Sequence, residues 1–222
     1  MTAASNGDTT GGSGAGVATD QAGTGEELAR LRSELEQARA AEAQVRALLQ
    51  AASAFYLADG VEAIFTELAR SAVAELGLAE ASTYRYDHDK GRLDGVVRAV
   101  AEGEGQVRLE GLEEVIPADA GHPVAAFVGG RLAAASDNEV VVLPPGDRIL
   151  VKMTPLQAQS NGLVVGVLSA TTPAQAMLGQ RELELLRTLV RLATGATEHA
   201  RIERLRTQLI SSVSHELRTP LA

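Results

Sequence analysis

Apolar residues recur at helical spacing in the first part of the chain. From Glu26 the sequence consists mostly of Ala, Leu, Glu, Arg and Gln, with neither Gly nor Pro before Gly60. The pattern predicts a long helix, of which residues 26–50 form a coiled-coil segment. Its seam alternates steps of three and four and is interrupted by one Glu: Leu28, Leu31, Leu35, Ala38, Glu42, Val45 and Leu49. The seam favours pairing with a second copy; a single amphipathic helix packed on its own domain is the alternative.

A second helix and a hairpin follow. Residues 59–78 carry apolar side chains at helical spacing, and Gly77 is a plausible helix end. The period then changes to two, which predicts strands at 81–86 and 92–100 joined by a polar turn at 87–91.

The middle of the chain predicts short elements. They are a strand, a loop and a short apolar helix or irregular segment over residues 113–116, 117–123 and 124–134, followed by strands over residues 140–143, 149–154 and 163–168. The dipeptide Asn161-Gly162 is a strong signal for a type I′ turn because both central positions of that turn need positive φ. We therefore expect the last two strands to pair antiparallel.

The chain ends in a second long helical segment. Residues 180–219 contain one Gly and no Pro, and a helix of that length would measure about 60 Å, so it must extend beyond a compact domain. Its apolar positions suggest a single seam and again a parallel dimer: Leu185, Leu189, Leu192, Ala196, His199, Ile202, Leu205, Leu209 and Val213.

These elements define an α+β fold, an antiparallel sheet of about five or six strands sandwiched with helices and flanked by long coiled-coil-forming helices. Residues 1–25 contain only Met1 and Val17 as sizeable apolar side chains and are predicted to be a disordered tail.

The composition of the chain excludes several classes of functional site and disfavours one class of partner. The chain has no Cys, which excludes a disulfide framework, a thiolate zinc site and a thioether-linked chromophore. A formal charge of -9 disfavours nucleic-acid binding. No apolar run is long enough to cross a bilayer and no signal peptide is recognisable, so we expect a cytoplasmic protein.

The last residues carry the most specific motif. The run SHELRTPL, beginning at Ser214, resembles the phosphoacceptor motif of the sensor histidine kinases of two-component systems. The resemblance implies that His215 is the phosphoacceptor and that Glu216 is the acid that keeps its imidazole nucleophilic. By the same resemblance, Thr219 helps to orient a hydrolytic water and Pro220 bends the helix. A neutral imidazole with an adjacent carboxylate is suited to this chemistry.

The middle of the chain resembles a GAF domain, a sensor module that binds small molecules or proteins. The segments that carry this resemblance are ASTYRYD, IPADAGHPVAAFV, LVKMTPLQAQSNGLVVGVLSATTP and the helix ELELLRTLVRLATGATEHA. The resemblance implies a ligand pocket on one face of the sheet, with five candidate lining residues: Tyr84, Tyr86, His122, Phe127 and Arg131. The ligand is unknown. Haem held by His88 or His122 is an open alternative, although both lie in predicted turns or loops.

The predicted domains are a tail (1–25), a coiled-coil helix (26–50), a GAF sensor domain (51–197) and a signalling helix that begins the phosphoacceptor domain (198–222). The family's ATP-binding domain is not encoded in these residues, so ATP and Mg²⁺ would be bound by a further domain, in cis or in trans, and activity of this chain alone is not expected. The expected partners are a second copy of the chain and a response regulator. The alternative is a stand-alone dimeric ligand-binding module that regulates a partner kinase.

Overall fold

The computed structural model describes residues 15–103, 105–128, 140–143, 147–154, 164–173 and 176–218, with side chains placed from residue 27 to residue 213 of these ranges. The chain divides into two compact units, residues 1–46 and residues 47–222. No helix of the described ranges is long and apolar enough to cross a membrane.

The first unit contains most of helix α1, Ala15–Leu57. The helix begins earlier than the predicted start at Glu26, so residues 15–25, predicted as tail, are helical; residues before Ala15 lie outside the described ranges. Extending a helix that already exists avoids the unfavourable nucleation step, and this explains how a Gly-containing segment can join it.

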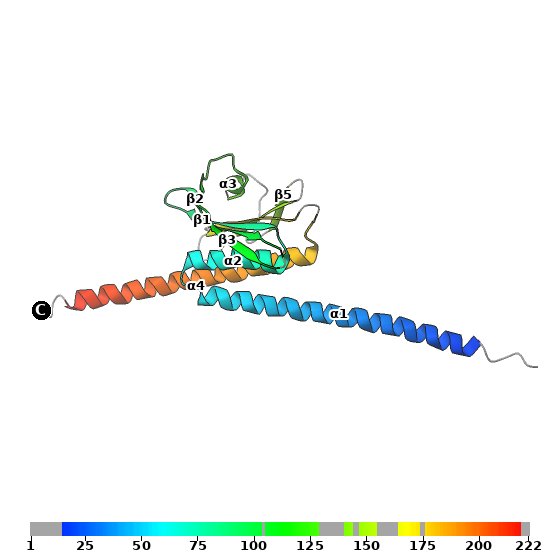
Figure 1. Ribbon diagram of the computed structural model, residues 1–222. Helices are drawn as coiled ribbons and strands as arrows, with labels where there is room; N and C mark the ends of the chain where they lie inside the picture. The colour runs from blue at the N-terminus through cyan, green and yellow to red at the C-terminus, as the bar shows by residue number, and fades with distance from the viewer. Residues whose placement is uncertain are drawn as a thin grey trace, which may run out of the picture. The chain divides into compact units, whose positions relative to one another are not determined.

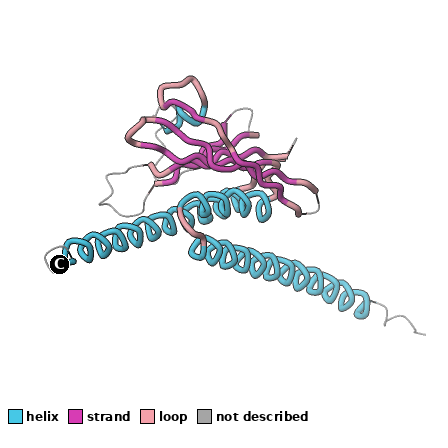
Figure 2. Tube along the Cα trace, turned by 60° about the vertical axis from the view of Figure 1, so that its left-hand side comes forward, coloured by secondary structure: helices cyan, strands magenta, loops and turns pink. Residues whose placement is uncertain are grey.

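The second unit is built on a seven-stranded antiparallel sheet with the order β3-β2-β1-β7-β6-β5, in which β4 also pairs with β2. The strands are β1 Glu80–Asp87, β2 Arg92–Ala101, β3 Val107–Gly111, β4 Val115–Pro117, β5 Val140–Leu143, β6 Arg148–Met153 and β7 Gly166–Thr171. Helices α2 Val61–Leu76 and α4 Gln180–Arg218 lie on one face, and the short α3 Pro123–Val128 lies on the other (Figures 1 and 2).

Local chemistry explains where several elements begin and end. Gly77 ends α2 in the left-handed conformation, φ 62°, as predicted. The turn between β1 and β2 forms as predicted, because Asp87 Oδ1 accepts the backbone N–H groups of Asp89 and Lys90, each at 3.1 Å. The hydrogen bond from the Lys90 N–H is also the main reason that the pKa of Asp87 lies below its ordinary value.

The sheet has two buried faces, and alternate residues of each strand supply them. The larger core lies under α2 and α4 and includes Phe65, Leu68 and Leu168; the C-terminal end of α1 adds Phe55. The smaller core lies under α3 and includes Tyr84, Leu93 and Phe127. The fold class predicted from the sequence is therefore confirmed.

Three details differ from the sequence expectations or extend them. Strand β3 was not predicted; it pairs with β2 at the edge of the sheet. The antiparallel pairing of β6 with β7 is confirmed, whereas the predicted Asn161-Gly162 turn lies outside the described residues. The segment 124–134, predicted as a short helix or an irregular segment, is helical in α3 as far as Val128, and its remaining residues lie outside the described ranges.

The predicted single seam of α4 is wrong, because its apolar residues occupy two different faces. Leu189 and Ala196 are buried in the domain, at 1% and 2% exposure. Further along, Leu205 and Leu209 are exposed. Each residue advances a helix by about 100°, so the continuous steps of three and four drift around it and the later residues face away from the domain.

Candidate functional site

The predicted pocket residues lie on the α3 side of the sheet. Tyr84 and Tyr86 occupy alternate positions of β1 that face α3. The other two residues of this stretch, Thr83 and Arg85, face α2. Phe127 on α3 is fully buried in the same core. Arg131 lies outside the described residues.

Glu114, which sequence reasoning missed, joins two of these predicted residues. The Tyr84 hydroxyl donates to Glu114 Oε2 at 2.9 Å, and Glu114 Oε1 lies 4.0 Å from His122 Nε2. Burial is the main cause, and the Glu114 hydrogen bond the second, of a pKa of Tyr84 that lies well above its ordinary value near 10. Tyr84, His122 and Glu114 therefore form one polar cluster at the edge of an apolar core.

A close backbone approach places Glu114. Gly95 on β2 donates its N–H to the Glu114 carbonyl at 2.7 Å. A Cβ at Gly95 would come within 2.6 Å of the Leu112 carbonyl oxygen, so only glycine lets this segment lie against the strand. The sequence signal was this glycine inside a strand pattern, which indicates a close contact but not its partner.

Sequence reasoning also missed a cationic side chain on this side of the sheet, Lys152. Lys152 on β6 lies on the α3 side of the sheet, with its Nζ 5.2 Å from the centroid of the Phe127 ring. Tyr86 packs edge-on against His88, with ring centroids 4.6 Å apart. His88 Nε2 is 2.8 Å from the Val164 carbonyl oxygen, and His122 Nδ1 accepts the Val124 N–H at 3.2 Å. Each of the two histidines considered for haem therefore has one ring nitrogen in a hydrogen bond.

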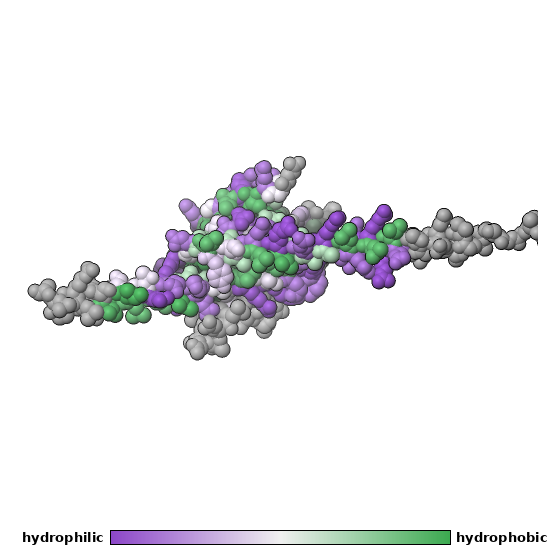
Figure 3. Space-filling model, turned by 90° about the horizontal axis from the view of Figure 1, so that it is seen from below, coloured by the Kyte–Doolittle hydropathy of each residue, from purple (hydrophilic) through white to green (hydrophobic). Residues whose placement is uncertain are grey.

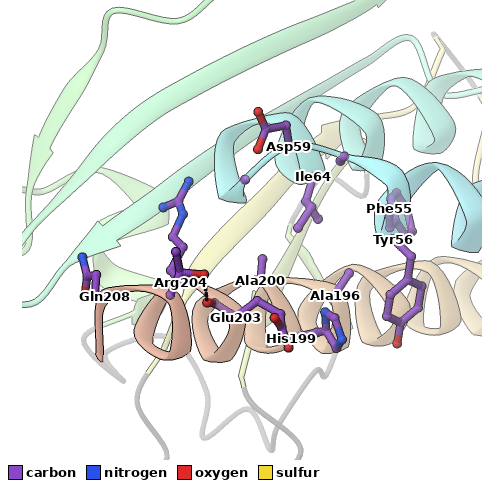
Figure 4. Close-up of a pocket in the computed structure, with 13 residues that line it drawn as sticks. Phe55, Tyr56, Asp59, Ile64, Ala196, His199, Ala200, Glu203, Arg204 and Gln208 are labelled. Atoms are coloured by element: carbon purple, nitrogen blue, oxygen red, sulfur yellow. Dashed lines mark hydrogen bonds between the residues drawn. The ribbon is translucent and has the colours of Figure 1, made fainter. Parts of the chain in front are cut away.

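A groove of about 410 Å³ lies on the opposite, helical side, where α4 passes the turn between α1 and α2 (Figure 4). Buried Phe55, Ile64 and Ala196 contribute to its apolar lining. Tyr56 packs edge-on against His199, with ring centroids 5.9 Å apart. None of these residues was predicted to line a pocket, and Ala196 and His199 were named only as positions of the α4 seam.

Arg204 covers the α1–α2 turn at the groove. Gly60 has φ 97°, and a Cβ there would lie 2.5 Å from the Arg204 guanidinium. Figure 4 shows the Arg204 side chain extending from α4 toward this turn. The turn between the two helices therefore depends on a glycine both for its backbone angle and for this contact.

The segment that was predicted to be a phosphoacceptor motif lies at the end of α4. The backbone of His215 and Glu216 belongs to the helix, whose described part ends at Arg218; Thr219 and Pro220 lie outside the described residues. No group of three or more His, Asp or Glu side chains that could hold a metal occurs in the described part of the chain.

Comparison with solved structures identifies the fold. The GAF domain of a phosphoenolpyruvate-protein phosphotransferase from Coxiella burnetii matches with a TM-score of 0.55 and 12% identity over 73% of this chain and 96% of that one. The corresponding domain from Acinetobacter gives 0.54 and 13% over 72% and 95%. The phycoerythrobilin-bound GAF domain of a cyanobacterial phytochrome gives 0.54 and 15% over 72% and 96%.

The second unit therefore has a GAF-like fold. No protein-family model matches the sequence, and no curated protein matches it significantly. At these identities the likeness concerns the fold, and the function has to be argued from the residues of this chain.

Proposed function

We propose that the chain is the sensory portion of a two-component sensor histidine kinase, in which the GAF-like domain binds a small ligand and controls phosphorylation of His215. One observation carries the proposal. Helix α4 is continuous from Gln180 to Arg218; its first half contributes Leu186 and Leu189 to the domain core, and its end carries the SHELR sequence. A change in the core beside α4 is thereby linked mechanically to the phosphoacceptor position.

The residues on the α3 side indicate the ligand chemistry. The Tyr84 hydroxyl donates to Oε2 of Glu114, which leaves Oε1 for another donor. Because the Glu114 side chain is 39% exposed, Oε1 can accept a hydrogen bond from a ligand. Lys152 supplies a cation above the Phe127 ring. A ligand with one hydrogen-bond donor for Glu114 and one acceptor or anionic group for Lys152 suits these two side chains.

In the proposed chemistry a ring nitrogen of His215 attacks the γ-phosphoryl group of ATP. A nitrogen–phosphorus bond forms, the bond to the departing ADP breaks, and Glu216 accepts the proton from the other ring nitrogen. The phosphoryl group then passes to an Asp of a response regulator. ATP and Mg²⁺ are held by a separate ATP-binding domain, in cis or in trans, and Thr219 orients water when the phosphoryl group is hydrolysed.

The phosphorylation is tested on the protein isolated from its source cells. We expect an acid-labile, base-stable phosphate that mass spectrometry locates at His215 and that is lost in His215→Gln. His199→Gln is the matched control, because it removes a histidine from the same helix and should leave the phosphate in place. A phosphate that persists at full level in His215→Gln contradicts the proposal.

The ligand site has its own test, a thermal-shift screen of small molecules against the chain. A ligand of the α3 side should raise Tm, and Lys152→Met should reduce the shift. The chain contains only one other lysine, Lys90, which lies in the exposed β1–β2 turn, so Lys90→Met is the control. Equal shifts in both variants would remove Lys152 from the site.

A further inference from the structure

Strand β3 forms one edge of the sheet and carries an exposed leucine. Most of the exposed large apolar side chains of the described residues lie on the long helices α1 and α4 (Figure 3). Leu109 is an exception, because it is 41% exposed and lies on a strand. β3 pairs with β2 on its inner side, and no other strand in the described part of the chain pairs with its outer side. A strand with such a free edge can accept a further strand.

The ladder between β2 and β3 shows which backbone groups point outward. The N–H of Leu112, directly after β3, donates to the carbonyl oxygen of Val96 on β2 at 3.3 Å. The backbone groups of successive residues in an antiparallel strand point to opposite sides, so the even-numbered residues of β3 bond to β2. The N–H and C=O groups of Val107, Leu109 and Gly111 therefore point away from the sheet.

The charges of β3 match those of a second β3. Arg108 and Glu110 lie on the same face of the strand and form an ion pair within the chain. If two copies of β3 pair antiparallel about Leu109, each Arg108 lies directly opposite Glu110 of the other copy. A shift of two residues would instead place like charges opposite each other, and so would an in-register parallel pair. The charges therefore select one orientation and one register.

The same register also suits the backbone and the apolar residues. Each of the three outward-facing residues would donate one hydrogen bond to the other copy and accept one from it. The two Leu109 side chains would meet at the centre and cover each other. Val107 would lie opposite Gly111, where nothing lies within 4 Å of a Cβ position, so a second strand has room there.

The strand at the opposite edge, β5, lacks this complementarity. β5 has the sequence VVVL, without a charged side chain, so nothing in it would determine the orientation or register of a partner strand. Charges on an edge strand usually prevent pairing with another chain. On β3 the two charges have opposite signs at alternate positions, so they repel a mismatched strand and attract a second β3.

From these features we propose that the free edge of β3 binds the β3 edge of a second copy, antiparallel about Leu109, so that two sheets become continuous. This surface is separate from the helical seams, from the ligand residues and from His215, and the inference rests on none of them. The contact spans only five residues of each strand, so it is weak and forms mainly where chains are concentrated. Together with pairing along the helices, it would link dimers into larger assemblies.

Charge exchange tests the pairing by sedimentation of the full chain over a range of concentrations. Arg108→Glu alone, or Glu110→Arg alone, turns both attractive cross-strand pairs into repulsive ones, and the Kd of the β3-dependent step should rise about thirtyfold. The double variant, Arg108→Glu with Glu110→Arg, restores both attractive pairs and should return to within about threefold of wild type. It carries both changes, so a folding defect of the single variants would not be rescued in it. Single variants that associate like wild type would overturn the proposal.

Cysteine cross-linking traps even a weak pair and tests its register, because the chain has no cysteine of its own. Leu109→Cys should form a disulfide-linked dimer under mild oxidation, since the Cα atoms of such facing residues lie about 5.5 Å apart. Val142→Cys on β5 is the control; Val142 is also 41% exposed, and its variant should cross-link slowly. Adding Arg108→Glu to Leu109→Cys should slow the reaction, and adding Glu110→Arg as well should restore it. Equal rates for the two cysteine variants, or a rate that the charges leave unchanged, would overturn the proposal in favour of a different partner for this edge.

Discussion

Substitution of Gly166 tests the close packing of the central strands. Gly166 begins β7, where it pairs with Arg85 of β1 and Met153 of β6. A Cβ at this position would overlap the carbonyl oxygen of Tyr84 and come within 2.8 Å of two ring carbons of Phe65. The carbonyl belongs to a strand paired on both sides, and Phe65 is fully buried, so neither neighbour can move away easily.

We expect Gly166→Ala to lower the free energy of unfolding by about 3 kcal/mol, the upper part of the usual range for overpacking. With a urea m-value of about 2 kcal/mol/M, the unfolding midpoint would fall by about 1.5 M. The assay is equilibrium unfolding in urea followed by circular dichroism, at one fixed chain concentration because pairing of copies would also contribute to stability.

Gly111→Ala is the matched control. Gly111 ends β3, and nothing lies within 4 Å of a Cβ built there. Its variant should stay within about 0.5 kcal/mol of wild type. If Gly166→Ala unfolds at the same urea concentration as Gly111→Ala, the packing between β7, β1 and α2 is looser than the structure indicates and the reasoning is refuted.

Three further substitutions have expected outcomes. Gly60→Ala forces a positive φ on alanine and displaces Arg204, so thermal unfolding should show a loss of about 1–2 kcal/mol; an unchanged Tm would contradict the described turn. Because the folded-state pKa of Tyr84 is raised, its contribution to stability is fully present below pH 10 and is lost as pH rises through that pKa. Urea unfolding of Tyr84→Phe should therefore show a gap to wild type that narrows above pH 10, and a gap that widens would reverse the sign. Glu42→Leu replaces the one charged residue of the α1 seam, so sedimentation should show a tighter dimer, and a weaker one would place Glu42 outside the seam.

The elements that the sequence predicted well are those with strong local periodicity or a glycine stop. Helix α2 with Gly77, and strands β1 and β2 with their Asp87 turn, follow from residues close in sequence. Strand β3 was missed because its five residues, VRLEG, have a weak alternation and depend on pairing with β2 for their conformation.

The candidate site was predictable only in part, for the same physical reason. Tyr84 and Phe127 are aromatic residues in recognisable segments, and the structure brings them into one core. Glu114 is distant from Tyr84 in sequence, and nothing local indicates that a glycine on β2 brings the two together. The change of face along α4 was missed for a similar reason. Spacings of three and four between successive apolar residues do not reveal whether the whole series stays on one side of the helix.

Because the apolar residues of α4 change face along the helix, inserted residues can be used to rotate its C-terminal half relative to its buried half. A residue inserted between Ala200 and Ile202 would leave the buried half of α4 in place and turn everything beyond it by about 100°. Four inserted residues would leave a net turn of about 40°, and seven would return the later half to within about 20° of its original direction. A series of such insertions would show whether the direction in which the end of α4 faces, separately from its distance from the domain, determines the output of the protein.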